Sequence, residues 1–426
     1  MLRPTAPRTV PAAGGRLAGV DAVRGLAVLG MFAVHVGPDP QPSGAGHLVM
    51  AADGRAPAVF TLLAGFSLAL AQRQKPSGPS GRGDRSSRGD RSGRSDRSGR
   101  GGPERTLRPL LVRSAVLAAL GLALAGLWPG ILVILTFFAL YFLAAEPFTR
   151  LSTPVLTVVA AASTVLGPLL SFLLGPLLGY EVSGRGAVPE PGHLTGWWGP
   201  LRVLDALLLS GAYPLLTYLP YVLVGLALGR LCDLGRPDVA RRMAGWGAAV
   251  AVAAYGAAWL AVEVGGGRER LLATIAERHP EALGAADPLR AVLGRQFGAI
   301  PSTSWDWLLI ADPYSQTPLE TLGNAGVGCA LIGLFVLLSR GALARLLRPL
   351  TALGAMALSA YVAHALVLAG PAYGVHSTAA LAVFAGAALL GAWAWQRALA
   401  GRPMARGPLE HLLRLATHGR PGRGTA

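Results

Sequence analysis

The sequence predicts an all-α protein: a polytopic transmembrane helix bundle of about ten spans, with both termini in the cytoplasm. Of the 426 residues, 52% are hydrophobic and 14% are charged, whereas a soluble domain carries about 25% charged residues. Apolar stretches long enough to cross a ~30 Å hydrocarbon core recur along the chain. This composition excludes a soluble enzyme, a collagen and a disulfide-stapled secreted domain, and we expect a multi-pass protein of the cell membrane, the inner membrane if the source is bacterial.

Ten segments of about 15–25 mainly apolar residues carry this prediction, because each is long enough to span the membrane as a helix. A shorter apolar piece, Leu201–Ala212, contains Arg202 and Asp205, so we interpret it as interfacial or re-entrant. The ten predicted spans are Leu17–Val36, Ala56–Ala71, Leu107–Leu127, Ile131–Ala145, Pro154–Leu178, Pro214–Leu231, Met243–Val264, Thr321–Leu338, Pro349–Gly370 and Thr378–Leu399.

The net charge of +16 is distributed in a way that favours this topology. With a cytoplasmic N-terminus and alternating sides, thirty of the 38 basic residues and nine of the 22 acidic residues fall in cytoplasmic segments. The cytoplasmic side is then strongly positive and the outer side slightly negative. Because Lys and Arg in short loops set orientation, the charge is a topology signal and does not indicate a nucleic-acid partner.

The predicted organisation follows from these spans. We expect a cytoplasmic tail over 1–16, two helices joined by an outer loop over 17–71, and a cytoplasmic linker over 72–106. The linker, rich in Arg, Gly, Ser and Asp, cannot bury a core, so it is expected to be disordered. It either attracts anionic head groups or serves as an expanded spacer, and we favour the spacer. Eight further helices, with outer loops over 179–213 and 265–320, fill 107–400, and a cytoplasmic tail covers 401–426.

Three ionisable residues within the first span are the leading functional candidates, since such groups are costly inside a membrane. Arg24 and His35 are eleven positions apart and share one face of a helix, roughly 16 Å apart along its axis, and Asp21 lies one turn before Arg24. A fixed cation suits a phosphate-bearing ligand, and an imidazole suits proton transfer. The alternative is an Asp21–Arg24 pair that anchors the helix end, with an interfacial histidine.

Other polar residues are weaker candidates. His47 lies in the irregular outer loop after the first span, where either a cavity or solvent could receive it. His364, with Tyr361 on the same segment, and Asn324 could line a cavity; for His364 a helix–helix hydrogen bond is the favoured alternative. The sequence holds no metal-ligand spacing, no GxSxG and no P-loop. Two cysteines cannot form a disulfide framework.

Several stretches resemble one membrane family. GVDAVRGLAVLGMFAVH, the loop ending in His47 and PAVFTLLAGFSLAL resemble the catalytic domain of heparan-alpha-glucosaminide N-acetyltransferase and its bacterial relatives, called domain of unknown function 418. The further matches are GAYPLLTYLPYVLVGLALGRL (211–231), TPLETLGNAGVG (317–328), RPLTALGAMALSAYVAHAL (348–366) and RGPLEHLLR (406–414). The resemblance implies a ten- or eleven-helix bundle in which cytoplasmic acyl-CoA donates an acyl group to an acceptor on the other face.

The resemblance also suggests residue roles. His47 matches the family's loop histidine, and His35 stands where the family has Asn. The Arg24-to-His35 spacing resembles that of the acyltransferase-three membrane O-acyltransferases. Either histidine is therefore the expected base, and Arg24, with Asp21, is expected at the CoA phosphates.

We therefore expect an integral-membrane acyltransferase. It would transfer an acyl group, most simply acetyl, from acyl-CoA as co-substrate to a hydroxyl or amine of a glycan, glycolipid or polyol at the outer face. A transporter of a small anionic metabolite and a non-catalytic scaffold or sensor are the alternatives, and a homo-oligomer stays open. A transporter should show an inverted repeat, and none is evident.

Overall fold

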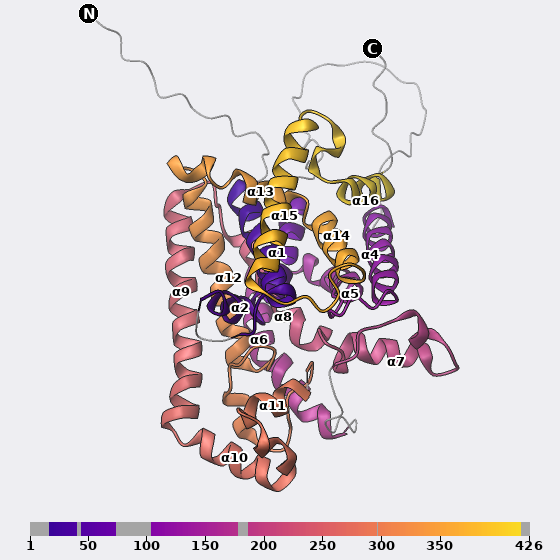
Figure 1. The fold of residues 1–426 in the computed structure, drawn as a ribbon. Helices are drawn as coiled ribbons and strands as arrows, with labels where there is room; N and C mark the ends of the chain where they lie inside the picture. Colours follow the sequence, from indigo (N-terminus) through magenta and orange to yellow (C-terminus); the bar gives the residue numbers. More distant parts are fainter. Residues whose placement is uncertain (1–16, 41–43, 74–103, 178–185, 296, 419–426) are drawn as a thin grey trace, which may run out of the picture.

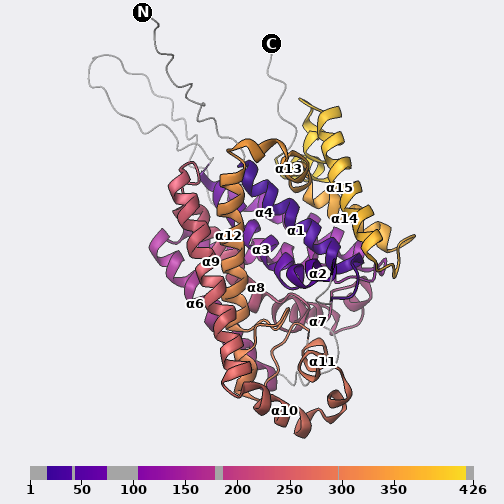
Figure 2. The same ribbon diagram turned by 60° about the vertical axis from the view of Figure 1, so that its left-hand side comes forward.

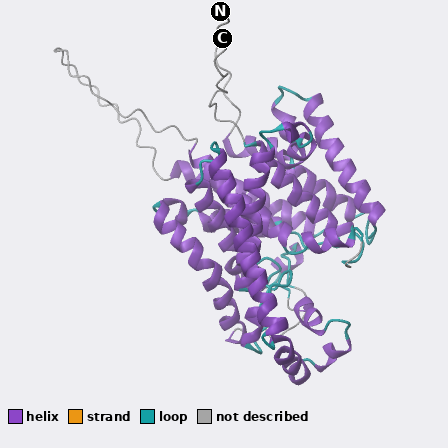
Figure 3. Cartoon of the chain, turned by 90° about the vertical axis from the view of Figure 1, so that its left-hand side faces the viewer, coloured by secondary structure: helices purple, strands orange, loops and turns teal. Residues whose placement is uncertain are grey.

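The computed structural model describes residues 17–40, 44–73, 104–177, 186–295 and 297–418. Most of the predicted linker over 72–106 lies outside these residues. Within the described chain, helices make up the fold (Figure 3), and the one isolated β-bridge joins Ala187 to Gly211. The predicted all-α class is confirmed for the residues described.

Seven described helices are long and apolar enough to cross a membrane. Figure 1 shows the bundle to which they belong. Alanine, leucine, valine and glycine dominate them, and lipid requires each spanning segment to satisfy its own backbone hydrogen bonds. The seven are α1 (Ala18–Val36), α3 (Arg55–Arg73), α4 (Glu104–Ala125), α6 (Thr153–Leu177), α9 (Pro237–Trp259), α12 (Pro318–Leu338) and α15 (Thr378–Ala398).

The other three predicted spans coincide with shorter or broken helices. Helix α8 (Leu215–Leu231) has 17 residues and α5 (Leu135–Ala145) has 11. The ninth segment is divided into α13 (Arg348–Ala355) and α14 (Ala357–Leu368), bent by 81°. The number of ten spans and the cytoplasmic termini therefore stay predictions.

Irregular backbone lies beside a cavity at two places, namely before α5 and between α13 and α14. The chain at Leu132 and Ile134, ahead of α5, and the α13–α14 break at Ala355 and Ala357 contribute to cavity walls. Non-helical backbone at membrane depth is tolerated where protein or a cavity surrounds it. The breaks thus mark where the bundle is open inside.

Helix α1 lies inside the bundle, between the α9–α12 pair and the α13–α15 group (Figure 2). Glycines let it approach its neighbours at backbone distance. A Cβ on Gly354 of α13 would lie 1.8 Å from the Asp21 carbonyl oxygen, and one on Gly25 would lie 2.2 Å from that of Leu350. This close contact holds the charged stripe of α1 against the broken helix.

Helices α10 (Gly267–Arg278) and α11 (Pro288–Arg295) lie at the opposite end of the molecule from α16 (Pro408–His418), as Figure 1 shows. They form a cap with its own apolar core, which includes Leu271, Ile275 and Trp307. The remaining short α-helices of the described chain are α2 (Gly46–Ala52) and α7 (Gly199–Asp205), the latter continued by a π-helical turn over Ala206–Ser210. Short 3-10 helices and a second π-helical turn, over Leu260–Val264, lie between the longer elements.

Candidate active site

A cavity of about 420 Å³ lies between α1, α3, α4, α5, the α13–α14 break and α16. Its walls are mainly apolar, with Phe60, Phe138 and Phe142 among them. It lies at the end of the bundle where α1 begins and α16 docks. Its polar lining consists of Asp21, Arg24, Ser67, Arg113, Tyr361 and Glu410.

Arg24 is held at the cavity wall from three sides. Its guanidinium donates to Asp21 Oδ1 at 2.6 Å, to Ser67 Oγ at 2.8 Å and to the Gly354 carbonyl at 3.5 Å. The pair predicted between Asp21 and Arg24 is therefore present. It does not remove Arg24 from the cavity, because both residues line it. A planar guanidinium fixed in this way is pre-organised for an anion.

Arg113 of α4 is a second cation in the same cavity, which sequence reasoning did not assign to the site. Its guanidinium stacks over the Phe142 ring at 4.0 Å, and its Nε atom is buried with no hydrogen-bond partner in the described chain. Its place inside an apolar segment was the signal that could have identified it, since ionisable groups within spans are functional candidates.

Glu410 of α16 closes one side of the cavity. Its carboxylate accepts hydrogen bonds from the backbone N–H groups of Leu358 and Ser359 at 2.8 and 3.1 Å and from Ser359 Oγ at 2.5 Å. It thereby caps the N-terminus of the half-helix α14, where backbone donors lack helical partners. The RGPLEHLLR tail motif is thus explained by docking against the broken span.

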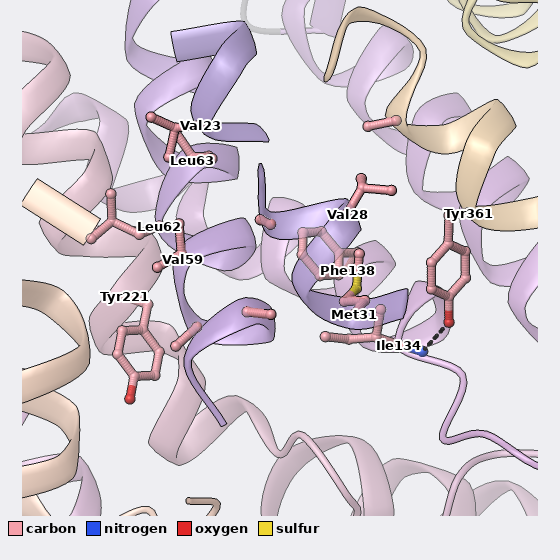
Figure 4. Close-up of a cluster of buried hydrophobic side chains, with 14 of the residues drawn as sticks. Val23, Val28, Met31, Val59, Leu62, Leu63, Ile134, Phe138, Tyr221 and Tyr361 are labelled. Atoms are coloured by element: carbon pink, nitrogen blue, oxygen red, sulfur yellow. Dashed lines mark hydrogen bonds between the residues drawn. The ribbon is translucent and has the colours of Figure 1, made fainter. Parts of the chain in front are cut away.

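This cavity shares three lining residues with a smaller pocket of about 10 Å³. Met31, Ile134 and Tyr361 line both spaces. Figure 4 shows them gathered beside Phe138, with the Ile134 N–H donating to the Tyr361 hydroxyl at 3.3 Å.

His35 lines the smaller pocket, together with Tyr213 and Tyr314. Its Nδ1 lies 3.0 Å from Nε2 of His364, a residue 329 positions later in the chain. His364 is 3% exposed and lies against Phe32, with ring centroids 4.2 Å apart. Of the residues predicted to line a cavity, Tyr361 lines both spaces, while His364 lies behind His35.

His47 is placed apart from this group. It is exposed on α2, with Nδ1 3.3 Å from the Gly44 carbonyl, and it lines neither the cavity nor the pocket. The structure therefore places Asp21 and Arg24 in the lining of the cavity, His35 in the lining of the pocket and Tyr361 in both. His47 lies outside both.

Asn324 belongs to a buried hydrogen-bond network at the start of α12 and lines neither space. It donates to Glu320 Oε1 and to the Tyr221 hydroxyl, each at 3.2 Å, and accepts from the Tyr255 hydroxyl at 2.8 Å. Arg55 continues the network by donating to Tyr255 at 3.2 Å.

Glu320 fixes the turn that carries Tyr314 into the pocket. Its carboxylate accepts from the backbone N–H groups of Tyr314 and Gln316 at 2.9 and 2.5 Å and from Ser315 Oγ at 3.2 Å. Tyr314 and Gln316 adopt φ values of 61° and 56°, which non-glycine residues rarely do. The buried carboxylate offsets this strain, so the turn is held in one conformation.

Two carboxylates outside the long helices, Asp53 after α2 and Asp312 in the segment that leads to Tyr314, have shifted pKa values. Burial raises the pKa of Asp53, opposed by Arg290, and raises the pKa of Asp312, again opposed by Arg290. Burial also raises the pKa of the Tyr314 phenol well above its usual value. The Tyr314 hydroxyl is therefore neutral near pH 7 and keeps its proton to donate.

Nothing in the described residues groups three or more histidine, cysteine or carboxylate side chains as a metal site would. Cys232 and Cys329 are half-buried and not joined in a disulfide. The ionisable groups that line the two spaces are two arginines, two carboxylates, an imidazole and three phenols.

Two family comparisons cover nearly the whole chain. Residues 16–261 match the family described as heparan-alpha-glucosaminide N-acetyltransferase, catalytic, and residues 267–420 match a protein family of unknown function, DUF418. No curated protein matches the chain. The first match contains the whole of α1 and all of α3 and α4; the second contains α14 and α16.

Proposed function

Because the chain belongs to the heparan-alpha-glucosaminide N-acetyltransferase catalytic family, we propose that it is an integral-membrane acyltransferase that uses acyl-CoA. The acyl group, most simply acetyl, would go to a hydroxyl or amine of a glycan, glycolipid or polyol at the other face. One observation carries the proposal: a cavity with two arginines and a pocket with a histidine have three lining residues in common.

The donor would occupy the larger cavity. Arg24 and Arg113 would hold the CoA phosphates, because a guanidinium binds a phosphate through paired, charge-assisted hydrogen bonds. The pantetheine arm would follow the apolar wall past Phe138. The thioester would then lie beside Met31 and Tyr361.

The acceptor would reach the thioester from the side of His35. Its oxygen or nitrogen attacks the carbonyl carbon while His35 Nε2 takes its proton. The C–S bond then breaks, its electron pair goes to sulfur, and His35 returns the proton to give the free thiol. The Tyr361 hydroxyl, which accepts from Ile134, keeps its own proton for the developing oxyanion. In the alternative route His35 Nε2 attacks first and carries the acyl group.

Acetyl-CoA binding to purified protein in nanodiscs tests the donor site. We expect Arg113→Gln to weaken binding about tenfold, since a charge-assisted hydrogen bond contributes roughly 1.5–3 kcal/mol. No ion pair among the described residues involves Arg113, so the change leaves no described carboxylate without its partner. Arg397→Gln is the matched control, because Arg397 is exposed on α15 over Trp393, outside the cavity. Equal affinity of Arg113→Gln and the native protein in calorimetry would remove Arg113 from the donor site.

A further inference from the structure

We propose that His364 is a positioning residue for His35: it holds the His35 ring in the tautomer whose Nε2 is free to accept a proton in the pocket. The inference rests on the proposed function for its chemical meaning. It depends on three features of the described residues, namely the contact between the two rings, the packing around His364 and the place of His35 in the pocket wall.

The contact joins one helix of the bundle to the broken span. His35 lies in the last turn of α1 and His364 lies in α14. Their rings are nearly parallel, at 12°, with Nδ1 of His35 and Nε2 of His364 3.0 Å apart. A nitrogen–nitrogen distance of 3.0 Å is that of a hydrogen bond, in which one ring donates and the other accepts.

Aromatic packing fixes the His364 ring. Phe32 stacks on it at 27°, and Phe384 meets it edge-on at 86° with centroids 5.2 Å apart. Phe32 is one turn before His35 on α1. The same turn of α1 therefore supplies both the base and one of the two rings that pack against His364. A buried ring between two phenylalanines cannot swing away without opening the core.

The hydrogen bond couples the two tautomers. If His35 Nδ1 carries the proton, it donates to His364 Nε2, and His35 Nε2 keeps a lone pair for an acceptor hydroxyl or amine. If His364 Nε2 carries the proton, His35 is protonated on Nε2 and cannot act as a base. A substrate that donates to His35 Nε2 selects the first arrangement, and His364 then orients the base as the third member of a catalytic triad does.

The hydrogen bond to His364 also stabilises the charged form of His35. When Nε2 takes the acceptor's proton, the Nδ1–H bond to His364 becomes charge-assisted and strengthens. His364 then stabilises the imidazolium until the proton is returned to the thiolate. The proton moves to His35 Nε2 as the acceptor bonds to the thioester carbonyl carbon, and it moves on to sulfur when the C–S bond breaks.

Three variants test the proposal by steady-state kinetics with acetyl-CoA. His364→Leu keeps an apolar ring-sized packing group but accepts no hydrogen bond, and we expect kcat to fall roughly 10–100-fold, as for other groups that orient a functional histidine. The KM for acetyl-CoA should not change. His364→Gln presents an amide oxygen near the former Nε2 and should restore most of kcat. Phe384→Leu loosens the packing without removing the acceptor and should lower kcat less than His364→Leu does.

A spectroscopic measurement separates this proposal from the proposed function. The ¹⁵N shifts of His35, assigned by loss of the signal in His35→Ala, report which ring nitrogen is protonated. We expect Nδ1–H in the native protein and in His364→Gln, and a mixture in His364→Leu. If the ¹⁵N shifts are as expected but the protein transfers no acyl group, the positioning role of His364 stands and the proposed acyltransferase function is refuted. An active native protein with full activity in His364→Leu, or with His364→Gln as slow as His364→Leu, would overturn the positioning alone.

Discussion

His35→Ala is expected to lower kcat for acyl transfer by about 10²–10⁴-fold, the usual contribution of a general base. The acceptor's proton would have no receiving group in the pocket, since the other side chains that line it with an ionisable group are neutral tyrosines. Acetyl-CoA affinity should not change, because His35 does not line the larger cavity. The measurement is turnover of labelled acetyl-CoA in proteoliposomes, with donor affinity measured in parallel.

His47→Ala is the informative comparison, because the family resemblance assigns the loop histidine to the reaction while the structure leaves it exposed. We expect a surface substitution there to change turnover little. A loss in His47→Ala as large as that in His35→Ala would mean that α2 closes over the pocket during turnover. Full activity of His35→Ala would remove His35 from the mechanism.

Glu320→Ala is expected to destabilise the protein by about 3 kcal/mol or more, because each buried donor left without a partner costs about 1–3 kcal/mol. Four donors lose their acceptor together, from Tyr314, Ser315, Gln316 and Asn324. The strained turn would relax and carry Tyr314 out of the pocket.

Thermal unfolding in detergent measures this effect. Glu277→Ala is the control, since Glu277 is exposed on α10 and contacts only Arg278, at 3.6 Å, among described ion pairs. Its stability should stay within about 0.5 kcal/mol of the native protein. Equal melting temperatures for Glu320→Ala and Glu277→Ala would show that the hydrogen bonds to Glu320 do not stabilise the protein.

Hydropathy predicted the apolar helices of the bundle but not the places where a helix is broken. Each of the ten apolar segments corresponds to a helix or a bent helix pair in the structure. The break before α14 falls within RPLTALGAMALSAYVAHAL, which is mainly apolar on both sides of the break, so a sliding average registers one span. The break is stabilised by Glu410, a residue more than fifty positions away, and no local pattern encodes that contact.

Part of the candidate site could be predicted from the sequence. The cost of charge in a span singled out Asp21, Arg24 and His35 on one helix, where spacing determines the shared face. The partners that complete the site come from distant segments: Arg113 from α4 and His364 from α14. Helical periodicity relates residues within one helix, so it could not join His35 to a side chain 329 positions away.

The most direct test of the account is a structure of the protein with coenzyme A bound. The account predicts phosphates within hydrogen-bond distance of Arg24 or Arg113, the pantetheine arm along Phe138, and the thiol beside Met31 and Tyr361 on the side of His35. Coenzyme A bound elsewhere, or with its thiol directed away from His35, would contradict the assignment of the cavity as the donor site.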